Sequence, residues 1–333
     1  MIKIAVDGMG GDYAPAVVVR GAESVARDNI AEIVLVGDEN AIKPLLKGSN
    51  GIEVVHTPVY VEMKESPSSA LRKKRESSIN KALELLKSGK VQAAVTAGNS
   101  GAAMAFAIFT LGRIGYVDRP AIATLHPNMK NSLSILLDAG GNVDCKPVHL
   151  AQFAVMGDAF ARCVLGVEKP TIGLLSNGEE ENKGNELTRE AHALIKGLDL
   201  NYIGYVEGTD MHNGRADVVV SDGFVGNVAL KITEGVAESL MAFFSDAIKK
   251  NMKARMGYLL MKDVFDELKR RMDPSEYGGA PLLGVDGVCI ICHGKSDEKA
   301  IRNAVLLAKK FVENGLNESI KETLWKVTDQ YGG

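Results

Sequence analysis

Cysteine, long apolar runs and an excess of charge are all scarce in this chain, and each scarcity excludes a class of protein. Only four cysteines occur in 333 residues, so no disulfide framework is expected. A net charge of -3 argues against a general nucleic-acid binder. No apolar run approaches the ~20 residues of a membrane span, and the first residues lack a signal-peptide pattern. We therefore expect a cytoplasmic protein with no nucleic-acid partner.

The sequence also lacks metal and nucleotide motifs. Cys289 and Cys292 have a C-x-x-C spacing, but they lie in an apolar run with no second cysteine pair, which favours buried small side chains over a metal or redox site. Asp138, Asn142 and Asp144 do not have the spacing of a calcium-binding loop. Neither the P-loop pattern nor G-x-G-x-x-G is found. We expect no metal and no cofactor.

Apolar strand patterns alternate with helical patterns along the whole chain. Strands are predicted at residues 2–6, 32–36, 53–56, 91–96, 121–125, 133–137, 171–175, 201–205, 217–220 and 288–292. Helices are predicted at residues 16–27, 78–88, 102–113, 146–165, 187–196, 227–250 and 297–314. This alternation is typical of an α/β fold with three layers, in which helices cover both faces of a mostly parallel sheet. We predict one α/β domain over residues 1–333, built either as a single unit or as two lobes around a cleft.

Glycine-rich polar turns follow five of the predicted strands. They begin at Asp7, Ala97, Asp138, Ser176 and Ser221, and they are rich in Gly, Asn, Asp and Ser. The first turn leads into a helix that Asp12 is suited to cap. Because the carboxyl ends of parallel strands share one edge of a sheet, these turns are predicted to line one site. Their backbone amides would suit an anion.

No classical nucleophile is evident, because G-x-S-x-G is missing and Ser100 lacks that context. Of the six histidines, only His293, at the end of a predicted strand, lies near the expected site; a buried or capping role is its alternative. The sequence therefore favours catalysis by positioning and electrostatics over a covalent intermediate.

Two basic stretches stand apart from these turns. Residues 72–75 read Arg-Lys-Lys-Arg before a predicted helix, which suits a solvated face, a phosphate or an acidic partner. The stretch from Lys249 to Arg271 is basic and amphipathic, and we expect it to form part of a protruding helical hairpin over residues 240–275. Gly257 is expected to break it, with residues 258–261 at the tip. Such a hairpin suits an anionic membrane surface, a core or a second subunit.

Eight motifs together resemble the bacterial phosphate acyltransferases, the acyl-ACP:phosphate transacylases of phospholipid synthesis. They are D-G-M-G-G-D-x-A-P from Asp7, R-x-K-x-x-S-S from Arg72, A-G-N-S-G-A from Ala97, L-D-x-G-x-N-x-D-x-K-P from Leu137, K-G-N-E-L-T from Lys183, D-G-F-x-G-N from Asp222, Y-G-G-A from Tyr277 and H-G from His293. The ordered set spans essentially the whole chain. Three positions depart from the family pattern: Gly8, Tyr13 and Ser176 stand where Ala, His and Asn are usual, which puts a role for those side chains in doubt.

The resemblance implies that inorganic phosphate attacks the thioester of a long-chain acyl-[acyl carrier protein] and releases acyl phosphate for phosphatidic acid synthesis. It also implies a fold similar to isocitrate and isopropylmalate dehydrogenases and to phosphotransacetylases, a homodimer, and peripheral association with the membrane through the stretch from Lys249 to Arg271. The acidic carrier protein is expected to dock first at residues 72–75.

The expected site follows from the same motifs. The residues expected to act in catalysis are Lys183, Asn185, Asn227 and His293. Those expected to bind phosphate or substrate are Asp7, Gly8, Gly10, Gly11, Asp12, Lys74, Asn99, Ser100, Gly101, Asp138, Asn142, Glu180, Asp222, Gly223 and Gly226. Lys183 and Lys74 would neutralise phosphate, and the asparagines would orient groups.

Three other functions fit parts of this pattern. A phosphotransacetylase would use a CoA thioester, and a non-catalytic scaffold would bind the carrier protein without forming acyl phosphate. A decarboxylating NAD-dependent dehydrogenase would need a cluster of metal-binding aspartates, which the sequence lacks.

Overall fold

A computed structural model describes residues 1–48 and 51–331; Ser49, Asn50, Gly332 and Gly333 lie outside the described residues. The strands are β1 (Lys3–Asp7), β2 (Glu32–Gly37), β3 (Ile52–His56), β4 (Ala93–Thr96), β5 (Ala121–Pro127), β6 (Leu133–Leu137), β7 (Ile172–Leu175), β8 (Tyr202–Val206), β9 (Val218–Val220), β10 (Ala280–Leu283) and β11 (Val288–Ile291). They form one eleven-stranded sheet in the order β3-β2-β1-β4-β11-β10-β5-β6-β9-β7-β8.

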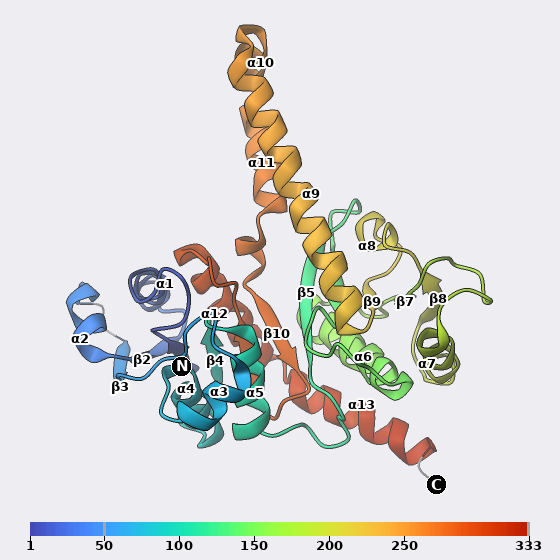
Figure 1. Ribbon diagram of the computed structural model, residues 1–333, viewed down its shortest axis with the longest axis horizontal. Helices are drawn as coiled ribbons and strands as arrows, with labels where there is room; N and C mark the ends of the chain where they lie inside the picture. The colour runs from blue at the N-terminus through green and yellow to red at the C-terminus, as the bar shows by residue number, and fades with distance from the viewer. Residues whose placement is uncertain (49–50, 332–333) are drawn as a thin grey trace.

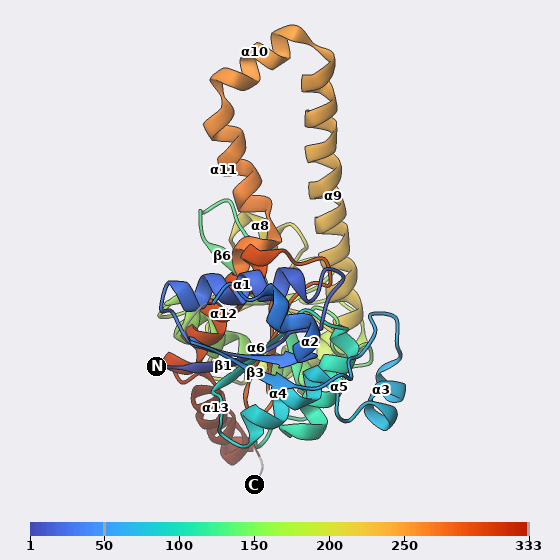
Figure 2. The same ribbon diagram turned by 90° about the vertical axis from the view of Figure 1, so that its left-hand side faces the viewer.

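Helices cover both faces of this sheet (Figures 1 and 2). The longer ones are α1 (Ala16–Arg27), α3 (Pro67–Lys73), α4 (Ser78–Lys87), α5 (Ser100–Thr110), α6 (Pro147–Phe160), α7 (Glu186–Lys196), α9 (Gly223–Lys250), α10 (Met252–Leu260), α11 (Lys262–Met272), α12 (Glu298–Glu313) and α13 (Leu316–Tyr331). The shorter ones are α2 (Glu39–Ile42), η1 (Lys43–Leu45), η2 (Ala161–Leu165), α8 (Asp210–Asn213) and η3 (Pro274–Tyr277).

Alternating side chains divide the core between the two faces. Ile4 and Val6 of β1 pack with α1 and α12, whereas Ala5 between them packs with α4 and α5. This is the period of two expected for a strand buried on both sides. The predicted α/β class is confirmed, and seven of the ten strand pairings are parallel.

The sheet is mostly parallel, as predicted, but the expectation that the five glycine-rich turns follow strands of one direction is wrong. β10 is antiparallel to β11 and to β5, and β5 is antiparallel to β6. The five strands β3, β2, β1, β4 and β11 therefore run in one direction, and β6, β9, β7 and β8 run in the opposite direction. The carboxyl ends of these two sets do not share one edge of the sheet. The sequence analysis missed β10, which is four residues long and contains Pro281.

One helical segment has the length and composition of a membrane span, contrary to the expectation from apolar runs. It covers Pro147–Leu165, the combined length of α6 and η2, and 72% of its apolar window is buried in the fold. Phe153 and Phe160 of α6 are fully buried, and Phe160 meets Phe311 of α12 edge to face. This segment is a core helix of the α/β fold.

A pair of helices projects far beyond the sheet (Figure 2). α9 is 28 residues long, which is about 42 Å at 1.5 Å per residue. The predicted break at Gly257 is wrong, because Gly257 lies inside α10. The chain turns instead at Asn251, whose side chain accepts hydrogen bonds from the N–H groups of Lys253 and Ala254, and again at Met261. α10 as a whole therefore forms the tip.

Candidate active site

The turn after β1 is built around a buried carboxylate. Asp7 is 3% exposed; its Oδ2 accepts a hydrogen bond from Thr96 Oγ1 at 2.7 Å, and its Oδ1 accepts one from the Met9 N–H at 3.2 Å. Burial raises the pKa of Asp7, against the hydrogen bonds that lower it. Thr96 Oγ1 also accepts the Gly98 N–H at 3.0 Å. This chain of bonds holds the turn after β1 against the turn after β4.

Glycine at position 10 is required by this close approach. A Cβ there would lie 2.5 Å from Asp7 Oδ2 and 2.7 Å from the Gly98 nitrogen. The turn after β11 joins the same group, because the Asp12 N–H donates to the Gly294 carbonyl at 2.7 Å. The neighbouring His293 side chain is exposed, and its Nδ1 accepts the Lys295 N–H. Turns after three adjacent strands therefore meet at one edge.

Asp12 does not cap α1 as expected. The N-cap is Pro15, and no side chain caps that helix. The Gly8 N–H is not free to bind a ligand, because it donates a hydrogen bond to the Val36 carbonyl at 2.8 Å. Tyr13, one of the departures from the family pattern, is 56% exposed.

The start of α5 presents unsatisfied donors beside this group of turns. Asn99 caps the helix by accepting the Ala102 N–H at 2.9 Å, and its Nδ2 donates to the carbonyls of Met63 and Glu65. Ser100 and Gly101 are exposed, and their N–H groups have no acceptor within the described part of the chain. Free N–H groups and the helix dipole attract anions at such a position.

Lys74 lies close to α5 but is already paired. Its Nζ is 2.8 Å from Glu65 Oε2 and donates to the Tyr60 carbonyl at 2.9 Å. The carbonyl of the same Glu65 accepts the hydrogen bond from Asn99. The Lys74 charge is therefore balanced by a carboxylate in this structure.

A second buried carboxylate organises the turn after β6. Asp138 is fully buried and accepts the N–H groups of Ile122, Gly140, Gly141 and Asn142, together with Asn142 Nδ2. Burial raises the pKa of Asp138, and these donors oppose that change. The amides of this turn therefore point at Asp138, so they are not free to hold an anion. Asn142 Nδ2 also donates to the Pro120 carbonyl at 2.7 Å.

The start of α9 packs directly on the turn after β6. Asp222 caps α9 by accepting the N–H groups of Phe224 and Val225, so the helix begins four residues before the predicted Asn227. Gly223 abuts the Asn142 backbone, and a Cβ at Gly226 would lie 1.9 Å from the Asp138 carbonyl oxygen. Because no side chain intervenes, α9 lies against the turn.

Asn227 is the half-buried polar side chain of this contact. A Cβ at Gly140 would lie 3.3 Å from Asn227 Cγ, and the Asn227 carboxamide has no hydrogen-bond partner among the described residues.

Helix α5 joins this cluster to the first, because a Cβ at Gly141 would lie 3.3 Å from Met104 Cε. Ser100 and Met104 are one helical turn apart, about 6 Å along the axis.

The loop after β7 carries the remaining predicted site residues. Asn185 caps α7 by accepting the Thr188 N–H at 2.9 Å. Lys183 Nζ lies 3.9 Å from Glu180, and its stem covers Gly178. Within the described residues, no hydrogen bond or ion pair joins Lys183, Glu180 or Asn185 to the turns of the first two clusters.

The structure thus arranges the predicted site residues in three groups. The group at the ends of β1, β4 and β11 holds Asp7, Gly8, Gly10, Gly11, Asp12, Asn99, Ser100, Gly101 and His293, with Lys74 beside it. The group joined to it by α5 holds Asp138, Asn142, Asp222, Gly223, Gly226 and Asn227. The sequence analysis missed Thr96 and Met104, which connect the turns; their residue types carry no signal of that role.

Side chains that bind metals do not gather in the part of the chain that the structure describes. In residues 1–48 and 51–331, no group of three or more His, Cys, Asp or Glu side chains is arranged to hold a metal ion. Cys289 and Cys292 are buried, as predicted, and burial raises the pKa of each thiol to about 12.

Comparison with known proteins identifies the family. A model described as fatty acid synthesis protein matches residues 2–319. A protein of Geotalea uraniireducens (strain Rf4) named phosphate acyltransferase is 50% identical over 327 residues, which cover 97% of this chain and 94% of that protein. This chain belongs to the phosphate acyltransferase family. The phosphate acyltransferase resemblance is therefore confirmed, and the chain is an acyltransferase enzyme.

Two solved structures share the fold of this phosphate acyltransferase family member. A phosphotransacetylase from Streptococcus pyogenes has a TM-score of 0.63 at 14% identity, with 94% of each chain covered. A 4-hydroxythreonine-4-phosphate dehydrogenase from Klebsiella pneumoniae has a TM-score of 0.57 at 15% identity, with 94% of this chain and 100% of that chain covered. At these identities the likeness shows the fold alone.

Proposed function

We propose that this enzyme transfers the acyl group of a long-chain acyl-[acyl carrier protein] to inorganic phosphate, giving acyl phosphate and free carrier protein for phosphatidic acid synthesis in the cytoplasm. The observation that carries the proposal is the pair of free N–H groups of Ser100 and Gly101, which lie where the turns after β1, β4 and β11 meet. Membership of the phosphate acyltransferase family supports phosphate as the acceptor.

The chemistry needs positioning more than it needs a protein nucleophile. A phosphate oxygen attacks the thioester carbonyl carbon, the carbon–sulfur bond breaks, and the electron pair leaves with the carrier thiol. A thiolate with a pKa near ~8.5 leaves with little acid assistance. The enzyme must hold a phosphate anion and stabilise the oxyanion that forms on the carbonyl oxygen.

The candidate residues divide these tasks between the clusters. In this proposal the start of α5 holds phosphate, and the free carboxamide of Asn227 donates to the thioester oxygen. His293 lies at the rim formed by Gly294 and Asp12, where an exposed imidazole is able to contact phosphate. In this proposal Lys183, which now lies beside Glu180, and Asn185 reach the bound substrate when the loop after β7 closes on it.

The reaction is tested by mixing the purified protein with acyl-[acyl carrier protein] and phosphate, and trapping acyl phosphate as a hydroxamate. Acyl-CoA in a parallel reaction distinguishes a phosphotransacetylase, and carrier binding without product identifies a scaffold. Lys183→Ala, with its fold checked by circular dichroism, is expected to lower the phosphate-dependent rate. An unchanged rate removes Lys183 from the mechanism.

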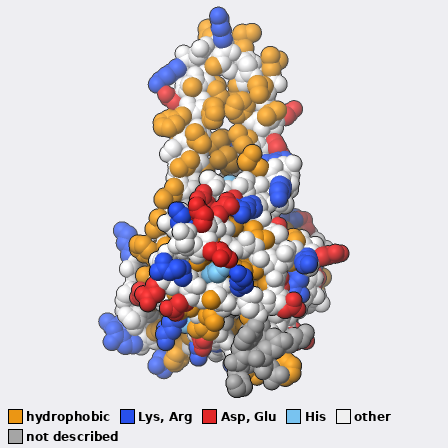
Figure 3. All heavy atoms as spheres, turned by 90° about the vertical axis from the view of Figure 1, so that its right-hand side faces the viewer, with side chains coloured by type: hydrophobic (Ala, Val, Ile, Leu, Met, Phe, Trp, Pro, Cys, Tyr) orange, Lys and Arg blue, Asp and Glu red, His pale blue; other side chains and the backbone are white. Residues whose placement is uncertain are grey.

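We also propose that the tip of the helical pair meets the membrane. Leu259 and Leu260 in α10 are 71% and 89% exposed, and cations such as Lys253 lie near them. Figure 3 shows hydrophobic side chains gathered on the projecting part of the molecule. Exposed apolar side chains with neighbouring cations suit an anionic lipid surface.

The double variant Leu259→Glu, Leu260→Glu tests this association in a flotation assay with anionic vesicles. It is expected to lose vesicle binding while its rate on carrier substrate in solution is retained. Leu194→Glu on α7, also at an exposed leucine, controls for added negative charge. Vesicle binding that persists in the double variant argues against the tip as the anchor.

A homodimer is the remaining part of the proposal. Exposed apolar side chains recur along α9 at helical spacing, including Val228, Ile232, Val236 and Leu240. A stripe of this kind along one helix suits burial against a second copy of the chain. Ile232→Glu should convert the protein to a monomer in analytical ultracentrifugation; a dimer that persists would exclude this stripe.

A further inference from the structure

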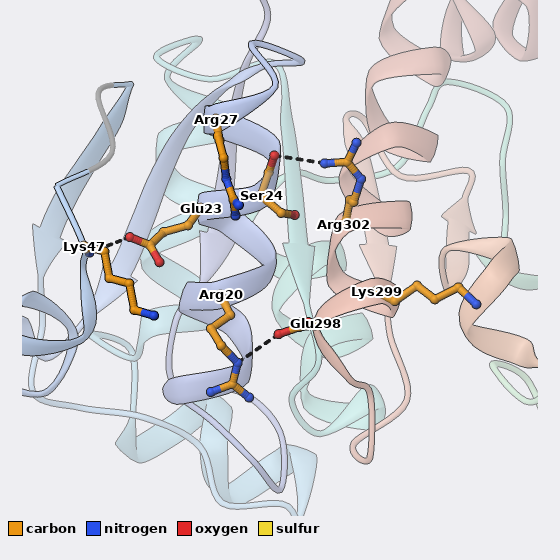
Figure 4. A pocket seen from close by; sticks show the side chains of 8 residues that line it. All are labelled: Arg20, Glu23, Ser24, Arg27, Lys47, Glu298, Lys299 and Arg302. Atoms are coloured by element: carbon orange, nitrogen blue, oxygen red, sulfur yellow. Dashed lines mark hydrogen bonds and ion pairs between the residues drawn. The ribbon is translucent and has the colours of Figure 1, made fainter.

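A shallow basic basin lies on the outer face of α1, between η1 and α12, away from the clusters described above. The basin encloses about 530 Å³. It is lined by Arg20, Glu23, Ser24, Arg27, Lys47, Glu298, Lys299 and Arg302 (Figure 4). Five of these side chains are cationic and two are acidic, so the basin is positively charged although the whole chain carries a net charge of -3.

Three of the cations in this basin have acidic partners. Arg20 pairs with Glu298 at 2.9 Å, Arg302 with Asp28 at 2.7 Å, and Lys299 with Glu276 at 2.7 Å. Surface ion pairs of this kind stabilise a fold only weakly, so the carboxylates of a binding partner can replace them.

The other two cations are not engaged. Arg27 and Lys47 are exposed, and their charged groups have no ion-pair partner within the described residues; only the Lys47 backbone N–H is bonded, to Glu23. The basin therefore keeps two free positive charges, one on α1 and one on the segment after η1.

The basin adjoins the edge where the candidate site begins. α1 starts just after the turn that holds Gly10 and Asp12, and Arg20 lies about 6 Å beyond Ala16 along the helix axis. α12 starts just after Gly294, which accepts the Asp12 N–H. A macromolecule bound in the basin would therefore be close to the start of the proposed phosphate site.

We propose that this basin is the docking surface for the acidic carrier protein of the acyl thioester. The inference rests on the proposed function and replaces residues 72–75 as the first docking surface. Charge favours it, because five cations line the basin and two of them have no ion-pair partner among the described residues. At residues 72–75, by contrast, Lys74 is neutralised by Glu65, and Arg75 lies over the Phe109 ring.

The test compares three double charge reversals in the full-length enzyme. Arg27→Glu with Lys47→Glu changes the basin, Arg72→Glu with Arg75→Glu changes the rival surface, and Lys310→Glu with Lys321→Glu is a control at exposed lysines outside both. Affinity for acyl carrier protein is measured by fluorescence anisotropy, and the KM is measured with carrier substrate and with acyl-pantetheine, which has no carrier.

The basin variant should weaken carrier binding and raise the carrier KM roughly tenfold at about 50 mM salt, with the difference shrinking at about 500 mM. Its kcat and its KM for acyl-pantetheine should match those of the unchanged enzyme. Loss of affinity in the variant at residues 72–75 alone, or equal loss in the control, overturns the proposal. Carrier bound through the basin without acyl phosphate formation would support the docking surface and refute the proposed reaction.

Discussion

Two glycines on one helix give a sharp test of how the second cluster is built. Gly226 and Gly235 both lie in α9. A Cβ at Gly226 would lie 1.9 Å from the Asp138 carbonyl oxygen, whereas a Cβ at Gly235 would have no neighbour within 4 Å. Alanine favours a helix over glycine by about 1 kcal/mol at either position, so only the local contact separates the two variants.

The size of the effect follows from that distance. Ordinary contact begins at 3.4 Å, so Gly226→Ala forces α9 about 1.5 Å away from the turn. The clashing atom is the backbone carbonyl oxygen of Asp138, which cannot rotate away as a flexible side chain can. Overpacking of a close contact costs about 1–3 kcal/mol and occasionally more. We expect Gly226→Ala to lower the free energy of unfolding by about 2–4 kcal/mol, and Gly235→Ala to raise it by about 0.5–1 kcal/mol.

Urea denaturation followed by circular dichroism measures both values under one set of conditions. Activity gives a second readout, because a misplacement of about 1 Å can cost about a hundredfold in rate. Gly226→Ala should lose activity even at temperatures where it remains folded, while Gly235→Ala keeps it. Equal stability of the two variants would refute the direct contact between α9 and the turn after β6.

Three further predictions concern buried and capping groups. Asp138→Asn replaces one acceptor oxygen with a donor that faces other N–H groups, so it should lower the free energy of unfolding by roughly 3 kcal/mol, seen as a lower melting temperature. An unchanged melting temperature contradicts the role of Asp138 in holding the turn after β6. Burial lowers the pKa of His126 from 6.5 to about 4. As the pH falls from 6.5 towards 4, His126 is therefore protonated in the unfolded chain but not in the folded protein, and the free energy of unfolding decreases. His126→Gln should flatten the pH dependence of stability in that range, and an unaltered profile would exclude His126 as a source. Asp222→Ala removes the α9 cap and should cost about 1 kcal/mol in urea denaturation; a variant as stable as the parent would show that the cap is dispensable.

Much of the fold was predictable from local patterns. Apolar runs identified ten strands, with ends that lie within two residues of the observed ones, because buried strands of a covered sheet are apolar on both faces. The direction of each strand in the sheet was not predictable from local patterns. The reversal between the two halves of the sheet depends on β10, a four-residue strand with a proline, and on which strands pair with it.

The candidate site shows a similar division. The glycine-rich turns were visible as motifs, but their hydrogen bonds were not. Asp138 looked like a substrate ligand, yet in the structure it binds the amides of its own turn. Lys74 looked like a free cation, yet Glu65 pairs with it. Partners of this kind come from segments that only tertiary packing brings together.

The central claim is that an anion binds at the start of α5. Arsenate is a phosphate analogue whose position in a crystal can be located by anomalous scattering, so a crystal soaked with arsenate tests the claim directly. The account predicts an arsenic peak with arsenate oxygens within hydrogen-bond distance of the N–H groups of Ser100 and Gly101. A peak confined to the loop that carries Lys183, or to the basin on α1, would contradict it.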